Sequence, residues 1–280
     1  MCCASNLPAA ADMVRPLKEL AQNGARRGPV PEALSGACRT LCALDPQPIT
    51  PNAPHPVHPV AMRQTWRRLT FLHWPYAPEL IRPLLPPSFE LDTFDGAAWL
   101  GLVPFEIFGT PVISRFPETN LRTYVIGPDG SRAVWFFSLD AARLLAVLGA
   151  RIAYHLPYFW ARITVASEGG TIRYRSRRRW PHHSAAMTDI VIQPGELYAP
   201  AELTARDHFL TARFRLYTIS RRRLRFAQIE HSPWPLAHAT VIEFRQTLTD
   251  ALGLPPPAGA PLAHYSAELA VNIGRLVRPA

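Results

Sequence analysis

The sequence predicts an α+β protein built mainly from antiparallel β-strands, with a few short helices between them. Segments with the composition of strands follow one another directly along most of the chain, whereas helical periodicity is confined to short stretches. The turn Gly127-Pro128-Asp129-Gly130 separates two such segments, and Asp-Gly is a strong hairpin signal. A doubly wound fold would instead alternate strands with helices, so this order of elements disfavours it.

The folded domain is expected to span residues 62–280. Residues 1–61 are rich in Pro, Ala and Gly and show neither strand alternation nor a sustained helical stripe. We interpret them as a disordered tail or a wrongly assigned start, because the patterned sequence begins directly after Met62. All four cysteines lie in this tail: Cys2, Cys3, Cys38 and Cys42. A core without cysteine disfavours a disulfide scaffold and predicts a cytoplasmic protein.

The first elements of the domain follow from composition and from proline. Trp66 to Trp74 has the β-branched and aromatic content of a strand, and Pro75 ends it. Residues 77–85 predict a short helix with Pro in its first turn. Residues 97–108 form an apolar run that is typical of a strand buried on both faces.

A hairpin and a helix are expected next. Residues 121–126 and 133–139 form the two strands of the hairpin, and Asp140 is placed to cap a helix over residues 141–154. The apolar, core-facing side of that helix would comprise Leu144, Leu145, Leu148 and Ile152.

The remaining elements complete the sheet. Gly169 and Gly170 form a turn between two strands, and a helix is expected within residues 204–213. The further strands are expected at residues 158–166, 172–178, 186–193, 224–230, 239–244 and 268–276.

The positive charge of the chain comes almost entirely from arginine. The formal net charge is +9, and Lys18 is the only lysine. Residues 173–180 interleave Arg with Tyr and Trp, as some nucleic-acid-binding surfaces do, and residues 221–225 form a second basic run. However, alternate residues of the first run are arginine, as on the solvated face of a strand, and no nucleic-acid-binding motif accompanies either run. We therefore favour solvated faces over nucleic-acid binding.

A set of motifs distributed over residues 62–280 identifies a family resemblance. In chain order they are Leu72-His73-Trp74, Asp92-Thr93-Phe94-Asp95-Gly96, Leu102-Val103-Pro104-Phe105, residues 118–125, Phe137-Ser138-Leu139-Asp140, Leu156-Pro157-Tyr158, residues 213–217 and His231-Ser232-Pro233-Trp234. Together they resemble the YqjF-like proteins, the family called domain of unknown function 2071. That family is similar in fold to acetoacetate decarboxylase, which implies a mostly antiparallel, incompletely closed β-barrel or cone around a buried pocket.

The resemblance also implies a missing nucleophile. Acetoacetate decarboxylase uses a buried lysine in a Gly-x-Pro-Lys-Lys segment, and the similar piece here is His155 to Ala161, where Tyr158 takes the place of the amine. Arginine cannot form a Schiff base in its stead. We therefore expect the pocket without imine chemistry, with Glu118 similar to the acidic residue on the neighbouring pocket strand.

Four polar residues alternate along this neighbouring strand: Glu118, Asn120, Arg122 and Tyr124. Alternation places all four on one face, where burial is costly unless they pair or meet a ligand. In the functional interpretation Arg122 clamps a carboxylate, Glu118 is an acid or base, and Asn120 or Tyr124 orients a carbonyl. In the structural interpretation Glu118 and Arg122 form an ion pair and Asn120 braces a loop.

Two further residues complete the candidate set. Tyr158 would polarise a ligand oxygen, the alternative being a core tyrosine with a satisfied hydroxyl. His73 is assigned to the pocket rim, the alternative being a structural histidine. Neither the pair His182-His183 nor His231 with His238 matches zinc spacing, so we assign no metal and no cofactor.

The sequence leaves three functions open. The leading one is a pocket protein, enzyme or not, that acts on a small carboxylate or keto compound. The others are a noncatalytic ligand-binding or sensor module and a nucleic-acid binder. The expected partner is a small anionic or carbonyl ligand and not a membrane, since no spanning stretch is recognised. A homo-oligomer stays open, and the sequence does not name the ligand.

Overall fold

Strands dominate the computed structural model, which describes residues 46–109, 115–181 and 186–279. The strands are β1 (Val60–Tyr76), β2 (Glu90–Leu91), β3 (Ala98–Phe108), β4 (Arg115–Ile126), β5 (Arg132–Ala141), β6 (Tyr158–Glu168), β7 (Thr171–Trp180), β8 (Met187–Leu197), β9 (Arg215–Ser220), β10 (Arg223–Glu230), β11 (Ala237–Gln246) and β12 (Leu262–Gly274). The helical elements are α2 (Pro78–Ile81), η3 (Arg82–Leu84), α3 (Leu144–Ala153), η4 (Pro200–Glu202), α4 (Ala205–Thr211) and η5 (Asp250–Leu252). The predicted α+β class with short helices is confirmed.

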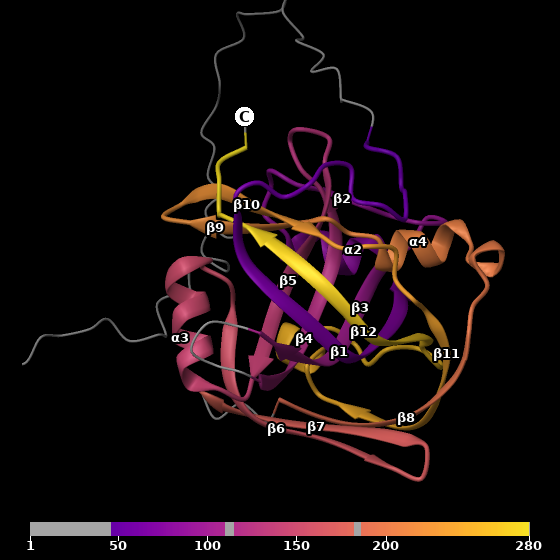
Figure 1. Cartoon of the computed structure of the whole chain (residues 1–280). Coiled ribbons are helices and arrows are strands. Elements are labelled where there is room, and N and C mark those ends of the chain that lie inside the picture. The colour runs from indigo at the N-terminus through magenta and orange to yellow at the C-terminus, as the bar shows by residue number, and fades with distance from the viewer. Residues whose placement is uncertain (1–45, 110–114, 182–185, 280) are drawn as a thin grey trace, which may run out of the picture. The chain divides into compact units, whose positions relative to one another are not determined.

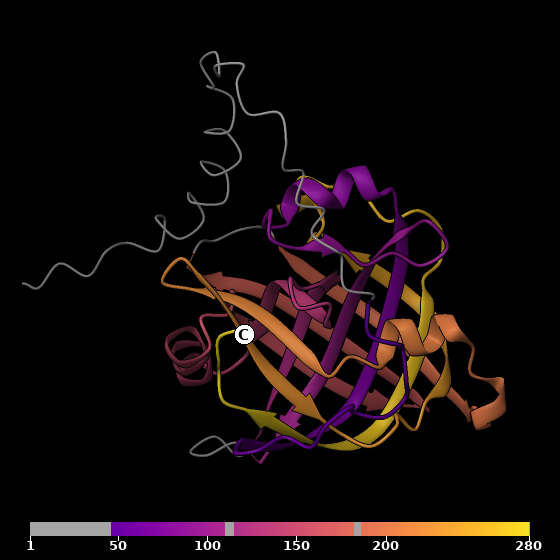
Figure 2. The ribbon, with the colours of Figure 1, turned by 90° about the horizontal axis from the view of Figure 1, so that it is seen from above.

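The sheet closes on itself into a ring of hydrogen-bonded strands. Five strands form a shared wall in the order β12-β1-β3-β4-β5. One closure runs from β5 through β6, β7, β8 and β11 back to β12, and a second runs from β5 through β9 and β10 to β12. Figure 1 shows β6 to β8 along one end and β9 with β10 at the other. In Figure 2, β1 and β12 run side by side, as their antiparallel pairing requires.

The shared wall separates two apolar cores. In β3, Val103 and Phe105 belong to the core on the side of β9 and β10, whereas Leu100 and Leu102 belong to the core on the side of β7 and β8. Successive side chains of a strand point to opposite faces. The uninterrupted apolar run predicted over residues 97–108 is therefore explained, because β3 is buried on both sides.

The predicted hairpin between β4 and β5 is confirmed, and its turn depends on glycine. The N–H of Gly130 donates to the carbonyl of Gly127 at 3.0 Å, and Gly130 has a φ of 72°. A Cβ on Gly127 would lie 2.0 Å from the hydroxyl oxygen of Tyr217. Only glycine lets the turn and Tyr217 approach this closely.

The predicted cap of the following helix is wrong. Asp140 lies within β5, where it is fully buried and pairs with Arg178 at 2.7 Å. The helix begins three residues later than predicted, at Leu144, and Arg143 provides no side-chain cap. Asp140 continues the strand because a buried charge gains more from a guanidinium partner than from the N–H groups of an exposed helix end.

The predicted apolar face of α3 is also wrong. Leu145 and Ile152 are 67% and 74% exposed, and Leu144 and Leu148 are exposed as well, whereas Val147 is fully buried. The helix is apolar on nearly every side, so periodicity alone does not decide which side meets the sheet. The smaller side chains pack inward and leave the leucines facing outward.

The folded unit begins before the expected boundary at residue 62. The N–H of Gln47 donates to the carbonyl of Gly130 at 3.1 Å, and the N–H of Val57 donates to Oε2 of Glu230 at 2.9 Å. Val57 is 5% exposed. Single apolar side chains and backbone hydrogen bonds hold this segment, and they leave no periodic pattern in the sequence. The four cysteines and Lys18 lie outside the described residues.

Candidate functional site

A cavity of about 550 Å³ lies in the core on the side of β9 and β10. Side chains from β1, β3, β4, β5 and α3 line it, together with Trp234. Most of the lining is apolar. Leu145 and Gly149 of α3 both line the cavity and are exposed. The cavity therefore opens beside α3.

Polar groups enter this apolar cavity chiefly from β4. Glu118, Asn120 and Arg122 line it, as their alternation predicts, because β4 is paired on both sides and its alternate residues face one core. Tyr158 joins them from the start of β6, which the parallel pairing with β5 brings beside Leu139. The tertiary fold therefore brings together four of the six predicted residues.

Glu118 and Tyr158 form a buried acid and phenol pair. The hydroxyl of Tyr158 donates to Oε2 of Glu118 at 2.8 Å. Burial raises the pKa of Glu118 to about 8, although the hydrogen bonds from Tyr158 and Asn120 act in the opposite direction. Burial, and then the nearby Glu118, hold the pKa of Tyr158 well above its usual value. At neutral pH both groups are protonated, so the pair presents a neutral acid that is able to give a proton or a hydrogen bond.

Arg122 is a buried cation with no acidic partner in the described part of the chain. Its side chain is 8% exposed, and it makes no ion pair with any of the described residues. One Nη2–H donates to the carbonyl of Leu210 at 3.3 Å, and within the described ranges Nε has no hydrogen-bond partner. Four strand positions separate Arg122 from Glu118, about 13 Å along the backbone. The ion pair of the structural interpretation is therefore not formed.

A second arginine of the cavity has a carboxylate partner. Arg213 lines the cavity, is 5% exposed and donates to Oδ2 of Asp92 at 2.7 Å. Asp92 also pairs with Arg132. Burial lowers the pKa of Arg213, and the carboxylate of Asp92 opposes that shift. The contrast with Arg122 shows that the fold supplies a carboxylate to one of these two buried cations.

His231 is a further residue of the cavity. In the sequence it is considered only as a zinc ligand, and it is not among the candidate site residues. It lines the cavity, and its Nδ1 lies 2.7 Å from the carbonyl of Ser232. A carbonyl only accepts, so Nδ1 carries the proton and Nε2 of the neutral ring is an acceptor. Burial, and less strongly Arg122, lower the pKa of His231. The residue lies in an irregular segment, so only its family motif could have indicated it.

Tyr124 and His73 stand behind the cavity lining. Tyr124 donates to the carbonyl of Leu210 at 2.6 Å, and Nε2 of His73 lies 2.7 Å from the Tyr124 hydroxyl oxygen. Both residues are completely buried, and neither lines the cavity. Burial, and then Arg122, lower the pKa of His73 well below its usual value. This geometry supports a structural role for the pair, which holds the end of α4 through the carbonyl of Leu210.

Metal-binding residues do not cluster in the described ranges. No group of three His, Cys, Asp or Glu side chains there is arranged as metal ligands would be. His182 and His183 lie outside these ranges. No helix of the described part is long and apolar enough to cross a membrane.

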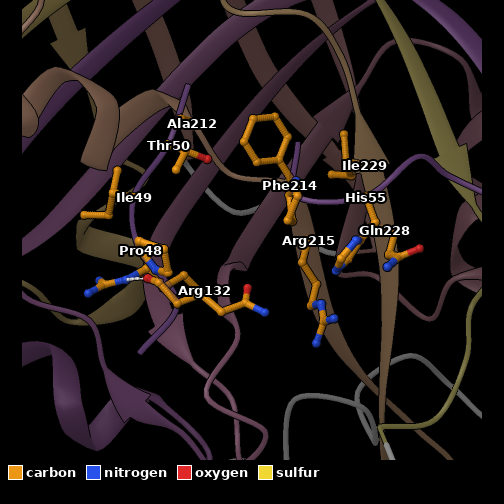
Figure 3. A pocket seen from close by; sticks show the side chains of 12 residues that line it. Pro48, Ile49, Thr50, His55, Arg132, Ala212, Phe214, Arg215, Gln228 and Ile229 are labelled. Carbon is orange, nitrogen blue, oxygen red and sulfur yellow. Dashed lines mark hydrogen bonds between the residues drawn. The ribbon is translucent and has the colours of Figure 1, made fainter. Parts of the chain in front are cut away.

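A smaller hollow of about 280 Å³ lies between residues 47–55 and strands β9 and β10 (Figure 3). Both of its arginines have a carboxylate partner: Arg132 pairs with Asp92, which it shares with Arg213, and Arg215 pairs with Asp129 at 2.5 Å. The guanidinium of Arg132 also donates to the carbonyl of Gln47 at 2.8 Å. This hollow lacks the unpaired charge of the larger cavity.

The predicted arginine face of β7 is engaged in surface ion pairs. Arg173 pairs with Asp189 at 2.8 Å and with Glu243, and Arg175 pairs with Asp189 at 3.2 Å. The acidic residues come from β8 and β11, so this charge is partly balanced within the sheet. The pairs support the interpretation of a solvated face.

Comparisons with known proteins agree with the motifs. The model of the family called domain of unknown function 2071, described as an uncharacterized conserved protein, matches residues 63–270. The chain is also 41% identical over 213 residues to the uncharacterized protein YqjF of Bacillus subtilis (strain 168), which covers 73% of this chain and 87% of that protein.

Solved structures show the same fold at low sequence identity. The enduracididine biosynthesis enzyme MppR, complexed with pyruvate, is 12% identical with a TM-score of 0.53, covering 78% of this chain and 90% of that one. An acetoacetate decarboxylase-like enzyme from Sphingomonas wittichii RW1 is 9% identical with a TM-score of 0.54, covering 79% and 93%. An acetoacetate decarboxylase is 13% identical with a TM-score of 0.52, covering 79% and 91%. The ring of strands thus has the acetoacetate decarboxylase type of architecture.

Proposed function

The chain belongs to the family called domain of unknown function 2071, and we propose that its cavity binds a small carboxylate or keto compound without imine chemistry. The observation that carries this proposal is the Arg122 guanidinium, which is buried in the cavity and has no ion-pair partner among the described residues. A buried charge is costly unless it is paired. A ligand carboxylate would supply the missing partner through two parallel hydrogen bonds.

The acid and phenol pair gives the ligand a second polar contact. Glu118 is neutral near pH 7, because burial raises its pKa to about 8. Its proton is therefore available to a carbonyl or leaving oxygen, and Tyr158 holds the carboxyl in position. His231 offers an acceptor nitrogen in the same cavity. These groups are able to bind a carbonyl compound and to move a proton at it.

Imine formation is excluded for the folded unit by its composition, since the sequence contains no lysine after Lys18. Tyr158 stands in the position that the family resemblance gives to the amine nucleophile. A solved structure of similar fold carries pyruvate, a keto acid, which supports a ligand of this class here. We infer a pocket that keeps carboxylate and carbonyl recognition and has lost covalent attachment.

The test is a thermal-shift screen of the full chain against small carboxylates and keto acids, with the matching neutral amides as controls. A ligand at about 100 times its dissociation constant adds roughly 2.7 kcal/mol to the folded state. We expect hits among the acids that are lost in Arg122→Met and retained in Arg162→Ala, which removes an exposed arginine of β6. Equal shifts for wild type and Arg122→Met would exclude Arg122 as the anchor.

A noncatalytic sensor is the alternative function of the same cavity, because no observation on this chain shows turnover. Glu118→Gln separates the two: it keeps a hydrogen-bonding side chain of the same shape and removes the transferable proton. An enzyme would lose turnover of a hit while still binding it. A sensor would show no consumption of the hit in either form.

A further inference from the structure

The cavity is larger than a small keto acid needs. Its volume of about 550 Å³ lies within the range of pockets that enclose drug-sized molecules. A carboxylate held by Arg122 with only two or three carbons would leave most of the apolar lining in contact with water. Because burial of apolar surface stabilises a complex, this lining is suited to a ligand with an apolar body.

Four aromatic side chains of the lining form one continuous surface, which we call the aromatic wall: Phe71, Trp234, Trp66 and Phe105. Ring centroids of Phe71 and Trp234 are 5.0 Å apart, edge to face. The Trp66 and Trp234 rings stack at 6.1 Å, and Trp66 meets Phe105 edge-on at 5.3 Å. Each ring therefore contacts the next, and all four belong to residues that line the cavity, where an aromatic ligand could contact them.

Arg122 lies at one end of the aromatic wall. The central carbon of its guanidinium is 5.3 Å from the centre of the Phe71 ring. Trp234 packs against the same Phe71 ring. When the carboxylate of a ligand binds Arg122, the adjoining part of the ligand therefore lies beside Phe71 and Trp234. Its far end then lies near Trp66.

We propose that the ligand is an aromatic carboxylic acid whose carboxylate binds Arg122 and whose ring lies on the aromatic wall. This inference rests on the proposed function and narrows its ligand class. A flat ring matches the wall better than a saturated ring of similar size, because aromatic pairs gain from offset-stacked and edge-to-face geometry in addition to buried area. Gly149 lies at the opening, and no heavy atom of the described residues outside its own helix lies within 4 Å of the position that its Cβ would take, which leaves room for such a ring to enter.

The ligand test compares acids that share one carboxylate. Dissociation constants of the full chain are measured by calorimetry for acetate, pyruvate, 3-cyclohexylpropionate and 3-phenylpropionate. We expect 3-phenylpropionate to bind at least about 100-fold more tightly than acetate, as its buried apolar surface predicts. We expect it also to bind several-fold more tightly than the cyclohexyl acid. Equal or tighter binding of the cyclohexyl acid would overturn the aromatic assignment.

A matched pair of tryptophan variants tests the wall itself. Trp66→Leu removes a ring of the wall, and Trp135→Leu removes a tryptophan of β5 that is also partly buried and contacts Phe89 outside the cavity. We expect Trp66→Leu to weaken 3-phenylpropionate binding about tenfold and to leave acetate unchanged, and Trp135→Leu to change neither. Equal losses in both variants would contradict a specific wall.

The two proposals fail separately. If the acids bind through Arg122 with no preference for the phenyl ring, the proposed carboxylate site is supported and the proposed aromatic ligand is refuted. If no acid of the series binds, or binding is indifferent to Arg122→Met, both proposals fall.

Discussion

Tyr158 and Glu118 meet in the cavity through a hydrogen bond of 2.8 Å, although 40 residues separate them in the sequence. The phenol donates, and the carboxyl it reaches is held neutral by burial, with a pKa of about 8. We propose this pair as the chemical centre of the cavity and Arg122 as the residue that anchors a ligand carboxylate. Both relationships lead to direct tests.

Glu118→Gln should remove a pH dependence of stability. The pKa of Glu118 is about 8 in the folded state and near its ordinary value of 4.5 in the unfolded state. Between these values the folded state binds the extra proton, so stability falls as pH rises from about 4.5 to 8, by up to about 1.4 kcal/mol per pH unit. Denaturant unfolding at pH 5, 6.5 and 8 should show wild type losing stability relative to Glu118→Gln. Parallel curves would show that Glu118 is ionised in the fold.

Tyr158→Phe should raise the pKa of Glu118 further, because the lost hydrogen bond is one of the two that lower it. The pH window in which wild type loses stability should then extend to higher pH. The same unfolding series measures this shift. An unchanged window would mean that Tyr158 acts only as a packing residue.

Arg122→Met should leave the unliganded protein at least as stable as wild type. Replacing a buried, unpaired cation by an apolar side chain of similar length removes a desolvation cost, at the loss of one 3.3 Å hydrogen bond to Leu210. Urea unfolding measures the difference. Destabilisation by several kcal/mol would instead identify Arg122 as a brace of the fold.

Asp92→Asn should destabilise the protein by about 3–5 kcal/mol, because it leaves the buried Arg213 charge without its carboxylate. Asp95→Asn is the matched control: it makes the same chemical change at an exposed position three residues further along the chain. Its φ of 51° suits asparagine, so we expect little effect there. Equal losses in the two variants would refute the role assigned to the Asp92 pair.

Truncation before Met62 should destabilise the folded unit relative to truncation before Pro46. The shorter chain loses the buried Val57 side chain and the 2.9 Å hydrogen bond from its N–H to Glu230. Burial of a valine alone is worth about 1.5–3 kcal/mol. Both proteins lack the first 45 residues, so their melting temperatures compare only residues 46–61. Identical values would place the domain boundary where the sequence put it.

Local sequence patterns predicted most of the secondary-structure elements. The hairpin turn at Gly130 follows from Asp-Gly, and the double burial of β3 follows from its uninterrupted apolar run. These predictions failed where the local sequence was compatible with more than one structure. Asp140 is an acceptable helix cap and an acceptable strand residue, and only the approach of Arg178 from β7 decides between them. The apolar faces of α3 are likewise equivalent until the sheet selects one.

The sequence by itself determined that Glu118, Asn120 and Arg122 share one face, because strand alternation is a property of the backbone, and that residues 46–280 contain no lysine that could form an imine. Only the tertiary structure decided that Arg213 receives a carboxylate and that Arg122 receives none from the described residues. It also decided that Tyr158 reaches Glu118 and that His231 lines the same cavity. Pairing, burial and the resulting pKa shifts depend on which distant strands close the ring. Those contacts depend on the packing of the whole core, so they cannot be predicted from local sequence patterns.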